Sequence, residues 1–222
     1  MIILNNPNNP SGAVYTREDL EAVAKLEVEH DLLVLSDEMY SRLVYDGAEF
    51  VSVTSLPGMR ERAIVVSGFS KSYAMTGWRL GYLIADKALI APMLKVHQYS
   101  TTCSPTFIQK GLVDSLENPQ TEKEVQDMLA AFAQRRQTIL AGLEQIPGLT
   151  PITPRGAFYV TVDVSATGLN GMDFMRGDNS LIGSLFDKAG IGADNARQAI
   201  FNAWNAIKDF LLKAWELIKA SA

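Results

Sequence analysis

The chain reads AIVVSGFSKSYAMTGWRLGYLIA from Ala63 to Ala85. An apolar run at 63–66 precedes a loop with hydroxyl, amine and guanidinium side chains, and a second apolar run at 80–85 follows it. Continuous runs of Val, Ile and Leu are typical of strands with both faces buried, as in the parallel sheet of an α/β protein. The stretch therefore predicts two strands of such a sheet, joined by a loop that carries polar chemistry.

The residues around this stretch continue the same pattern. Strands are expected at 2–4 and 32–35, and a helix is expected to begin at Thr16, with Asp19 as its partner in a capping box. Alternation of strands and helices favours α/β layering. Further helices are expected at 86–99, 105–117 and 121–145, and a strand of a smaller second layer at 157–164.

The composition argues against several classes of function. The 222 residues are 47% hydrophobic and carry a net charge of −5, whereas a nucleic-acid surface needs a basic excess. Cys103 is the one cysteine, and with only His30 and His97 beside it a zinc site of Cys and His is not expected. No apolar run is long enough to span a membrane, and the chain start does not resemble a signal peptide. We therefore expect no metal, no nucleic acid, no membrane and a cytoplasmic location.

Polar side chains follow each of the first three expected strands. The Asn/Pro/Gly loop 5–12 follows the first, Asp37 and Tyr40 follow the second, and Lys71 and then Arg79 follow the third. Ligands of open α/β sheets bind outside the carboxyl ends of the strands. An amide, a carboxylate, a phenol, an amine and a guanidinium are therefore expected to meet at one rim of the sheet.

Three segments resemble, in order and spacing, the signature segments of class I/II aminotransferases, which are fold-type I enzymes that depend on pyridoxal phosphate. The segments are NPNNPSG at 6–12, DEMY at 37–40 and SGFSKSYAMTGWRLGY at 67–82. The spacing includes Arg79 eight residues after Lys71. Two further stretches, at 95–99 and 103–106, resemble the aspartate/aromatic subgroup, and 154–159 resembles the start of a small-domain strand. The resemblance extends over about residues 1–190.

The resemblance implies roles around the cofactor ring. Lys71 would form the Schiff base with the cofactor aldehyde and then move the Cα proton of the substrate. Asp37 would face the pyridine nitrogen and keep it protonated. Tyr40 and Asn9 would donate hydrogen bonds to the phenolic oxygen. The implied cofactor is pyridoxal 5'-phosphate.

The resemblance also implies a phosphate site. Arg79 would clamp the phosphate with its guanidinium fork, a geometry that lysine does not offer. A hydroxyl from Ser67 or Ser70 would add to this site, and the sequence leaves both as candidates.

The fold implied is α/β: a partial, mainly parallel sheet of the aminotransferase large domain with flanking helices, a small α+β segment and a C-terminal amphipathic helix. The expected parts are a partial large, cofactor-binding domain at 1–118, a partial small domain at 119–190 and an appended helix at 191–222. Family members carry an N-terminal portion with the phosphate cradle before the first strand, and a carboxylate-binding arginine after about residue 190. Neither is expected here. The appended helix is read from one apolar stripe: Ile200, Trp204, Ile207, Leu211, Trp215 and Ile218.

Three functions remain open on this basis. The first is amino-group transfer between an amino acid and a 2-oxo acid, with aspartate or an aromatic amino acid suggested by the subgroup and a homodimer as the usual assembly. The second is a truncated or engineered scaffold that keeps the Lys71 constellation without turnover and self-associates through the terminal helix. The third is an adhesion or interaction module that uses the Arg176-Gly177-Asp178 tripeptide or the terminal helix. Chance is the better explanation of the tripeptide.

Overall fold

The computed structural model describes residues 1–176, and their side chains up to Phe174. The expected terminal helix at 191–222 and most of the tripeptide at 176–178 lie outside the described residues. The chain divides into two compact units, one of residues 1–142 and 151–161, the other of residues 143–150 and the chain from 162 onward. The expected boundary at Asn118–Pro119 lies where one helix ends and the next begins, inside the first unit, and stays a prediction.

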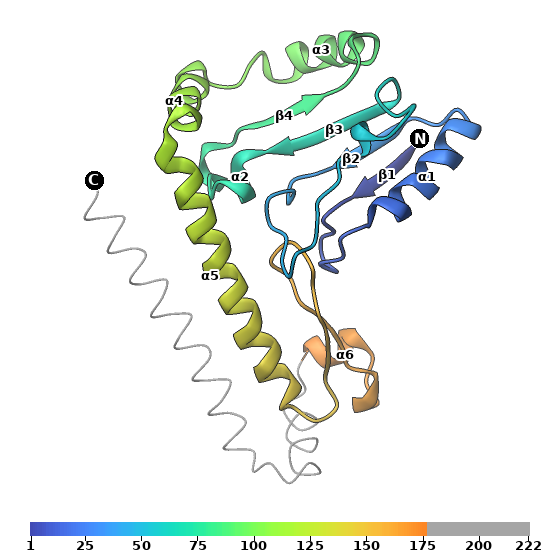
Figure 1. Cartoon of the computed structure of the whole chain (residues 1–222), viewed down its shortest axis with the longest axis vertical. Coiled ribbons are helices and arrows are strands. Elements are labelled where there is room, and N and C mark those ends of the chain that lie inside the picture. The colour runs from blue at the N-terminus through green and yellow to red at the C-terminus, as the bar shows by residue number, and fades with distance from the viewer. Residues whose placement is uncertain (177–222) are drawn as a thin grey trace. The chain divides into compact units, whose positions relative to one another are not determined.

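A four-stranded sheet forms the centre of the first unit, in the order β1 (Ile2–Asn5), β2 (Val34–Asp37), β3 (Ala63–Gly68) and β4 (Gly81–Ile84) (Figure 1). The first three strands are parallel, and β4 is antiparallel to β3. This confirms the mainly parallel sheet. The prediction that all four strands are buried on both faces is wrong for β4, whose four residues are all exposed, and for β1, which has no buried residue.

Helix α1 (Arg17–Glu29) covers part of the sheet. The amide of Asp19 donates to the Thr16 hydroxyl, and the Asp19 carboxylate accepts from the Thr16 amide, so the predicted capping box is present. The apolar face of α1 packs on β2 and on the segment that leads to β3. This core consists of Leu20, Ala24, Val34, Val51, Val53, Leu56, Met59 and Ala63, with Leu4 against it.

Three short elements lie between these strands. The 3-10 helix η1 (Val53–Ser55) lies between β2 and β3, and α2 (Phe69–Ser72) and the 3-10 helix η2 (Thr76–Trp78) lie between β3 and β4. Two exposed helices, α3 (Lys87–Thr101) and α4 (Thr106–Glu117), follow β4. Both confirm the predicted helices, and the Asp86 carboxylate caps α3 by accepting from the Ala88 amide. Pro92 lies within the second turn of α3 without ending the helix.

The longest helix, α5 (Pro119–Glu144), begins two residues earlier than predicted, because proline fits the first turn of a helix, where its missing N–H costs nothing. Its apolar face packs on the segments after β2 and before β6. Met128, Leu129 and Phe132 of this face contact a core of Tyr40, Leu43 and Ala157, with Met39 and Tyr159. Helix α5 thus supports the loop that follows β2.

The end of the described chain holds β5 (Thr150–Ile152), β6 (Thr161–Asp163), η3 (Ser165–Thr167) and α6 (Gly171–Arg176). Strands β5 and β6 pair in a two-stranded sheet. The strand predicted at 157–164 is therefore confirmed only for its second half. Its start is not extended, because Ala157 has a positive φ of 58° and the backbone amide of Ala157 donates to the carbonyl of Leu43.

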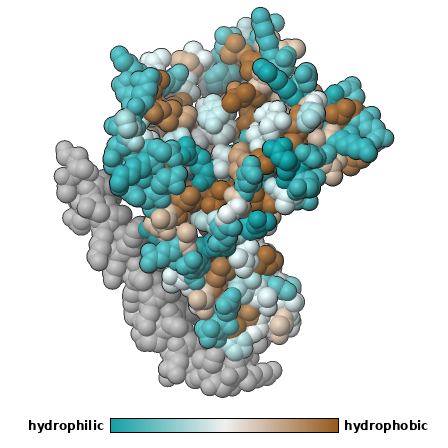
Figure 2. Space-filling model, viewed as in Figure 1, coloured by the Kyte–Doolittle hydropathy of each residue, from teal (hydrophilic) through white to brown (hydrophobic). Residues whose placement is uncertain are grey.

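The surface is mixed, with apolar side chains between hydrophilic ones on the face shown in Figure 2. Exposed large apolar residues occur on both edge strands, with Ile3 of β1 and Ile84 of β4 more than half exposed. No helix of the described residues is long and apolar enough to cross a membrane.

Candidate functional site

Asp37 lies at the carboxyl end of β2, in register with Asn5 at the end of β1 and Val66 of β3. One of its carboxylate oxygens accepts a hydrogen bond from the Met39 amide at 3.2 Å, and its main-chain carbonyl accepts from the Asn5 side chain at 3.3 Å. The carboxylate is half-buried. It is therefore held at the rim of the sheet where ligands of α/β proteins bind.

Glu38, the next residue, is instead a core residue. It is buried, and its carboxylate accepts from the Ser36 hydroxyl at 3.1 Å and from the Ser52 hydroxyl at 2.8 Å. Burial raises the pKa of the Glu38 carboxyl, while these hydroxyl donors oppose the shift. Of the two adjacent acids, Asp37 is therefore the one available to a ligand.

Tyr40 and Asn9 are joined through a third residue, Tyr159. The hydroxyl oxygens of Tyr40 and Tyr159 lie 2.8 Å apart, and the Asn9 side-chain amide donates to the Tyr159 hydroxyl at 3.3 Å. Tyr40 is 3% exposed. Burial, and next the hydrogen bond with Tyr159, raise the pKa of the Tyr40 phenol. Tyr40 is thus a neutral phenol at physiological pH.

Lys71 lies in α2, directly after β3, and its ammonium nitrogen is 5.4 Å from the centroid of the Phe158 ring. The same ring contacts Tyr40 edge-on, with centroids 5.3 Å apart, and stacks on Phe132 of α5, with centroids 5.6 Å apart. Phe158 therefore brings the amine and the phenol of the candidate site to one aromatic surface.

The predicted phosphate residues have different surroundings. Ser67 is buried, and its hydroxyl donates to the main-chain carbonyl of Glu38 at 3.2 Å. Ser70 is half-buried, and its hydroxyl has no hydrogen bond within the described part of the chain. Arg79 is exposed, has a positive φ of 54° and donates to the Thr76 carbonyl at 2.9 Å. Among the described residues, no hydrogen bond or ion pair joins the side chains of these three to Tyr40 or Lys71.

Phe158 and Tyr159 were not predicted as site residues. The sequence identified their segment only as the start of a strand. The structure places them by main-chain hydrogen bonds, because the amides of Arg155 and Gly156 both donate to the Gly12 carbonyl, at 2.8 and 2.9 Å. These hydrogen bonds join segments far apart in the chain, so no local sequence pattern could have predicted them.

Two glycines make this approach possible. Gly12 has φ +69°, and a Cβ there would lie 2.2 Å from the Cβ of Pro154. A Cβ at Gly156 would lie 2.6 Å from the Cβ of Pro7. The buried hydroxyl of Tyr45 also links the two segments, because it donates to the Ala157 carbonyl at 2.6 Å. Burial raises the pKa of Tyr45 to about 12.

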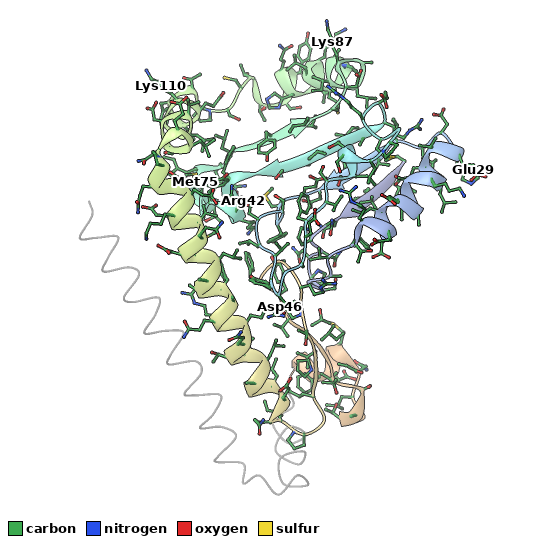
Figure 3. All side chains as sticks on the ribbon, viewed as in Figure 1. Glu29, Arg42, Asp46, Met75, Lys87 and Lys110 are labelled. Carbon is green, nitrogen blue, oxygen red and sulfur yellow. The ribbon has the colours of Figure 1, made fainter. Side chains whose placement is uncertain are left out.

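Two ion pairs connect α5 to the loop after β2. Arg42 binds Glu122 and also donates to the Tyr73 hydroxyl at 3.2 Å. Arg136 binds Asp46 through both guanidinium nitrogens. Figure 3 labels Arg42 and Asp46, which both lie in this loop. Helix α5 therefore braces the segment that carries Tyr40.

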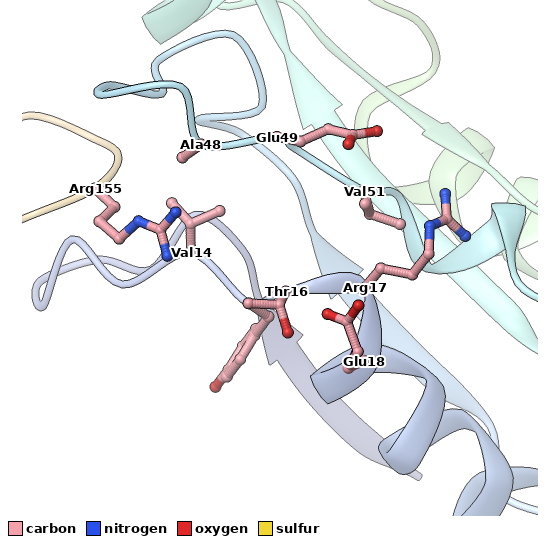
Figure 4. A pocket seen from close by; sticks show the side chains of 9 residues that line it. Val14, Thr16, Arg17, Glu18, Ala48, Glu49, Val51 and Arg155 are labelled. Atoms are coloured by element: carbon pink, nitrogen blue, oxygen red, sulfur yellow. The ribbon is translucent and has the colours of Figure 1, made fainter.

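A separate pocket of about 260 Å³ lies beside the start of α1. Arg155 and Arg17 line it from opposite sides, together with Glu18 and Glu49 (Figure 4). None of the predicted site residues lines this pocket. Among residues 1–174, no group of three or more His, Cys, Asp or Glu side chains is placed to hold a metal ion.

The mainly parallel sheet and its flanking helices define an α/β fold, and comparison with known proteins gives the family. Residues 1–198 match the family model of aminotransferase class I and II, and the chain belongs to this family. This confirms the resemblance drawn from the three sequence segments.

The chain is similar to several characterised members of the family. It is 42% identical, over 86% of its length, to aromatic-amino-acid aminotransferase 2 of Thermococcus litoralis, and 41% identical over 86% to the aspartate aminotransferase of Pyrococcus abyssi. Among solved structures it matches the aromatic aminotransferase of Pyrococcus horikoshii, with a TM-score of 0.77 and 43% identity over 79% of this chain and 47% of that one. The chain spans about half the length of the curated relatives that it matches.

Proposed function

We propose that this chain transfers the amino group of an amino acid to a 2-oxo acid, with pyridoxal phosphate as the cofactor. In the reaction the donor amino acid becomes a 2-oxo acid and the acceptor 2-oxo acid becomes an amino acid, so no external oxidant or reductant is consumed. The observation that carries the proposal is that the Lys71 ammonium and the Tyr40 ring both contact the ring of Phe158.

The donor set at the rim fits this cofactor. Pyridoxal phosphate presents a pyridine nitrogen, a phenolic oxygen, an aldehyde and a phosphate. Asp37 offers a carboxylate at a strand end, Tyr40 and Asn9 offer neutral donors held by Tyr159, and Lys71 offers an amine in the loop after β3. The pyridine nitrogen, the phenolic oxygen and the aldehyde thus each have a chemical partner among these residues.

When bound, pyridoxal phosphate supplies an aldehyde that reacts with amines and a ring that withdraws electrons from the substrate Cα. Lys71 would hold the cofactor through its aldehyde carbon and would move the proton at the substrate Cα. Asp37 would accept a hydrogen bond from the protonated pyridine nitrogen. Tyr40, whose pKa is raised by burial, would donate to the phenolic oxygen.

For the phosphate, the surroundings favour Ser70 over Ser67. The Ser67 hydroxyl is already used by the Glu38 carbonyl, whereas the half-buried Ser70 hydroxyl has no partner within residues 1–174. Arg79 is exposed and makes one hydrogen bond, to Thr76, so its fork keeps free donors for an anion. We assign the phosphate to Ser70 and Arg79.

The substrate class proposed is aspartate or an aromatic amino acid, since the similar proteins are named for these substrates. A homodimer is the proposed assembly. The alternative is a chain that binds the cofactor but does not turn over.

The first experiment is an absorbance spectrum of the chain with pyridoxal phosphate, followed by borohydride reduction and peptide mapping. We expect a visible band, and label on Lys71. Lys71→Ala and Asp37→Ala should lose the band, whereas Lys110→Ala, a lysine on exposed α4, should keep it. Label scattered over surface lysines would contradict the proposal.

The second experiment adds an excess of aspartate or phenylalanine to the loaded chain and measures the 2-oxo acid that is released. One equivalent released per Lys71 supports amino-group transfer. A bound cofactor without release of 2-oxo acid would leave the alternative, a binding scaffold without turnover.

A further inference from the structure

Tyr159 forms a hydrogen bond with Tyr40, the most buried phenol in the candidate site. The Tyr40 ring is enclosed by edge-on contacts with Phe158 and with Tyr159, whose ring centroid lies 5.8 Å away. Among the described residues, the hydroxyls of Tyr40 and Tyr159 share a hydrogen bond at 2.8 Å. A buried phenol usually has such a partner, because leaving its O–H without one is costly.

Tyr159 also holds Asn9. Asn9 lies on the exposed loop after β1, where its backbone amide donates to the Asn5 side chain at 2.6 Å. Its side-chain amide donates to the Tyr159 hydroxyl at 3.3 Å. One hydroxyl therefore links two groups that follow two different strands and lie 119 and 150 residues from Tyr159 in the chain.

The link leaves both groups able to bind a ligand. A phenol takes part in up to three hydrogen bonds, one as donor and two as acceptor, and Tyr40 uses one with Tyr159. The Asn9 amide has two N–H groups and uses one. Tyr159 therefore fixes the two side chains and leaves each of them with capacity for a further hydrogen bond.

We propose that Tyr159 is a positioning residue, which holds Tyr40 and Asn9 as a pair of donors to one oxygen atom of the ligand. This inference rests on the proposed function for the identity of the ligand, but the link itself is a property of the chain without any ligand. The raised pKa of Tyr40 supports the inference, because the hydrogen bond with Tyr159 contributes to it.

The test is Tyr159→Phe, which keeps the ring and removes the hydroxyl. The matched control is Tyr99→Phe on α3, because Tyr99 is 94% exposed. In the cofactor-free chain, NMR follows the Cζ carbon of Tyr40 and the side-chain amide of Asn9. We expect both resonances to move in Tyr159→Phe and neither to move in Tyr99→Phe. Unmoved resonances in Tyr159→Phe would overturn the link.

The second measurement is the affinity for pyridoxal phosphate, taken from the visible band. Tyr159→Phe should weaken binding by roughly tenfold, as expected for the loss of one or two hydrogen bonds that orient donors. In an Asn9→Ala background the same substitution should have a smaller effect, because the link is already broken. Equal effects in both backgrounds, or unchanged affinity in Tyr159→Phe, would overturn the positioning role.

The two measurements also separate this inference from the proposed function. A wild-type chain that binds no pyridoxal phosphate would contradict the proposed function, while the NMR comparison would still decide the link. Asn9→Ala tests the link from the exposed end of the pair, so the result does not depend on the folding of a core variant. It should move the Cζ resonances of Tyr159 and Tyr40, and unmoved resonances would overturn the inference.

Discussion

The ammonium nitrogen of Lys71 lies 5.4 Å from the ring centroid of Phe158, and the two residues come from α2 and from the segment before β6. At this distance the face of an aromatic ring attracts a cation. The ring is 39% exposed, so water weakens this attraction in part. Phe158 is therefore expected to restrain the lysine rather than to bury it.

Phe158→Leu keeps an apolar side chain and removes the aromatic face. We expect about fivefold weaker capture of pyridoxal phosphate at Lys71, from the loss of a partly exposed cation–π contact. Titration of the visible band measures this change. Phe107→Leu, on the exposed face of α4, is the control and should bind as the wild type does. An unaltered Phe158→Leu titration would show that the ring does not hold the lysine.

The ion pair of Arg136 and Asp46 should stabilise the fold. Arg136 is 8% exposed and also donates to the Pro154 carbonyl at 2.7 Å, so removing its partner leaves a buried charge. Asp46→Ala should lower the free energy of unfolding by about 1–3 kcal/mol, between the values for exposed and buried pairs. Urea unfolding measures it.

The control for this ion pair is Asp127→Asn, which breaks the exposed pair of Lys123 and Asp127 within α5. That substitution should not change stability measurably, because exposed ion pairs contribute little. If Asp46→Ala were as stable as this control, the brace between α5 and the loop after β2 would have no energetic role.

Glu27 of α1 should make stability depend on pH. The residue is fully buried, and both carboxylate oxygens lack a hydrogen-bond partner. Burial raises the pKa of this carboxyl above its ordinary value of 4.5, against the opposing charge of Arg62. The folded chain therefore binds a proton more tightly than the unfolded chain, so stability is greatest below the ordinary value and falls as pH rises through the raised pKa.

Glu27→Met should remove this fall and raise stability at pH 8 by about 1–3 kcal/mol, the cost of an unpaired buried polar group. Glu29→Gln, on the exposed end of the same helix, is the matched control (Figure 3). Thermal melts from pH 4 to pH 8 give the comparison. Parallel curves for Glu27→Met and the wild type would refute the assignment.

Gly12 and Gly47 form a matched pair for testing the close approach at Pro154. Their φ angles are +69° and +70°, so alanine has the same backbone strain at both. A Cβ at Gly47 meets nothing within 4 Å, whereas one at Gly12 would lie 2.2 Å from the Cβ of Pro154. Gly47→Ala should cost about 1 kcal/mol and Gly12→Ala clearly more.

Gly12→Ala should also displace Tyr159, since the Gly12 carbonyl accepts from the amides of Arg155 and Gly156. The Tyr159 Cζ resonance reports this displacement in the folded variant. Equal unfolding energies for Gly12→Ala and Gly47→Ala would contradict the contact with Pro154.

Much of the fold was predictable, because its signals are local. The capping box of Thr16 and Asp19, the apolar runs of β1 to β3 and the stripe of α5 each depend on neighbours within one turn or one strand. The exposure of β4 was not predictable, since an apolar run does not say whether other elements cover it. The strand predicted from Ala157 was wrong at its start, because distant hydrogen bonds to Leu43 fix that backbone.

The site divides in the same way. The sequence by itself determined the family and the identity of the candidate ligand-binding residues, since Asn9, Asp37, Tyr40, Lys71 and Arg79 lie in segments whose order and spacing are specific. Only the tertiary structure decided that Tyr159 joins Asn9 to Tyr40, and that Phe158 faces Lys71. The physical reason is distance along the chain. Contacts between residues far apart in the chain depend on how glycines, main-chain hydrogen bonds and α5 bring the segments together, and local sequence patterns do not record this.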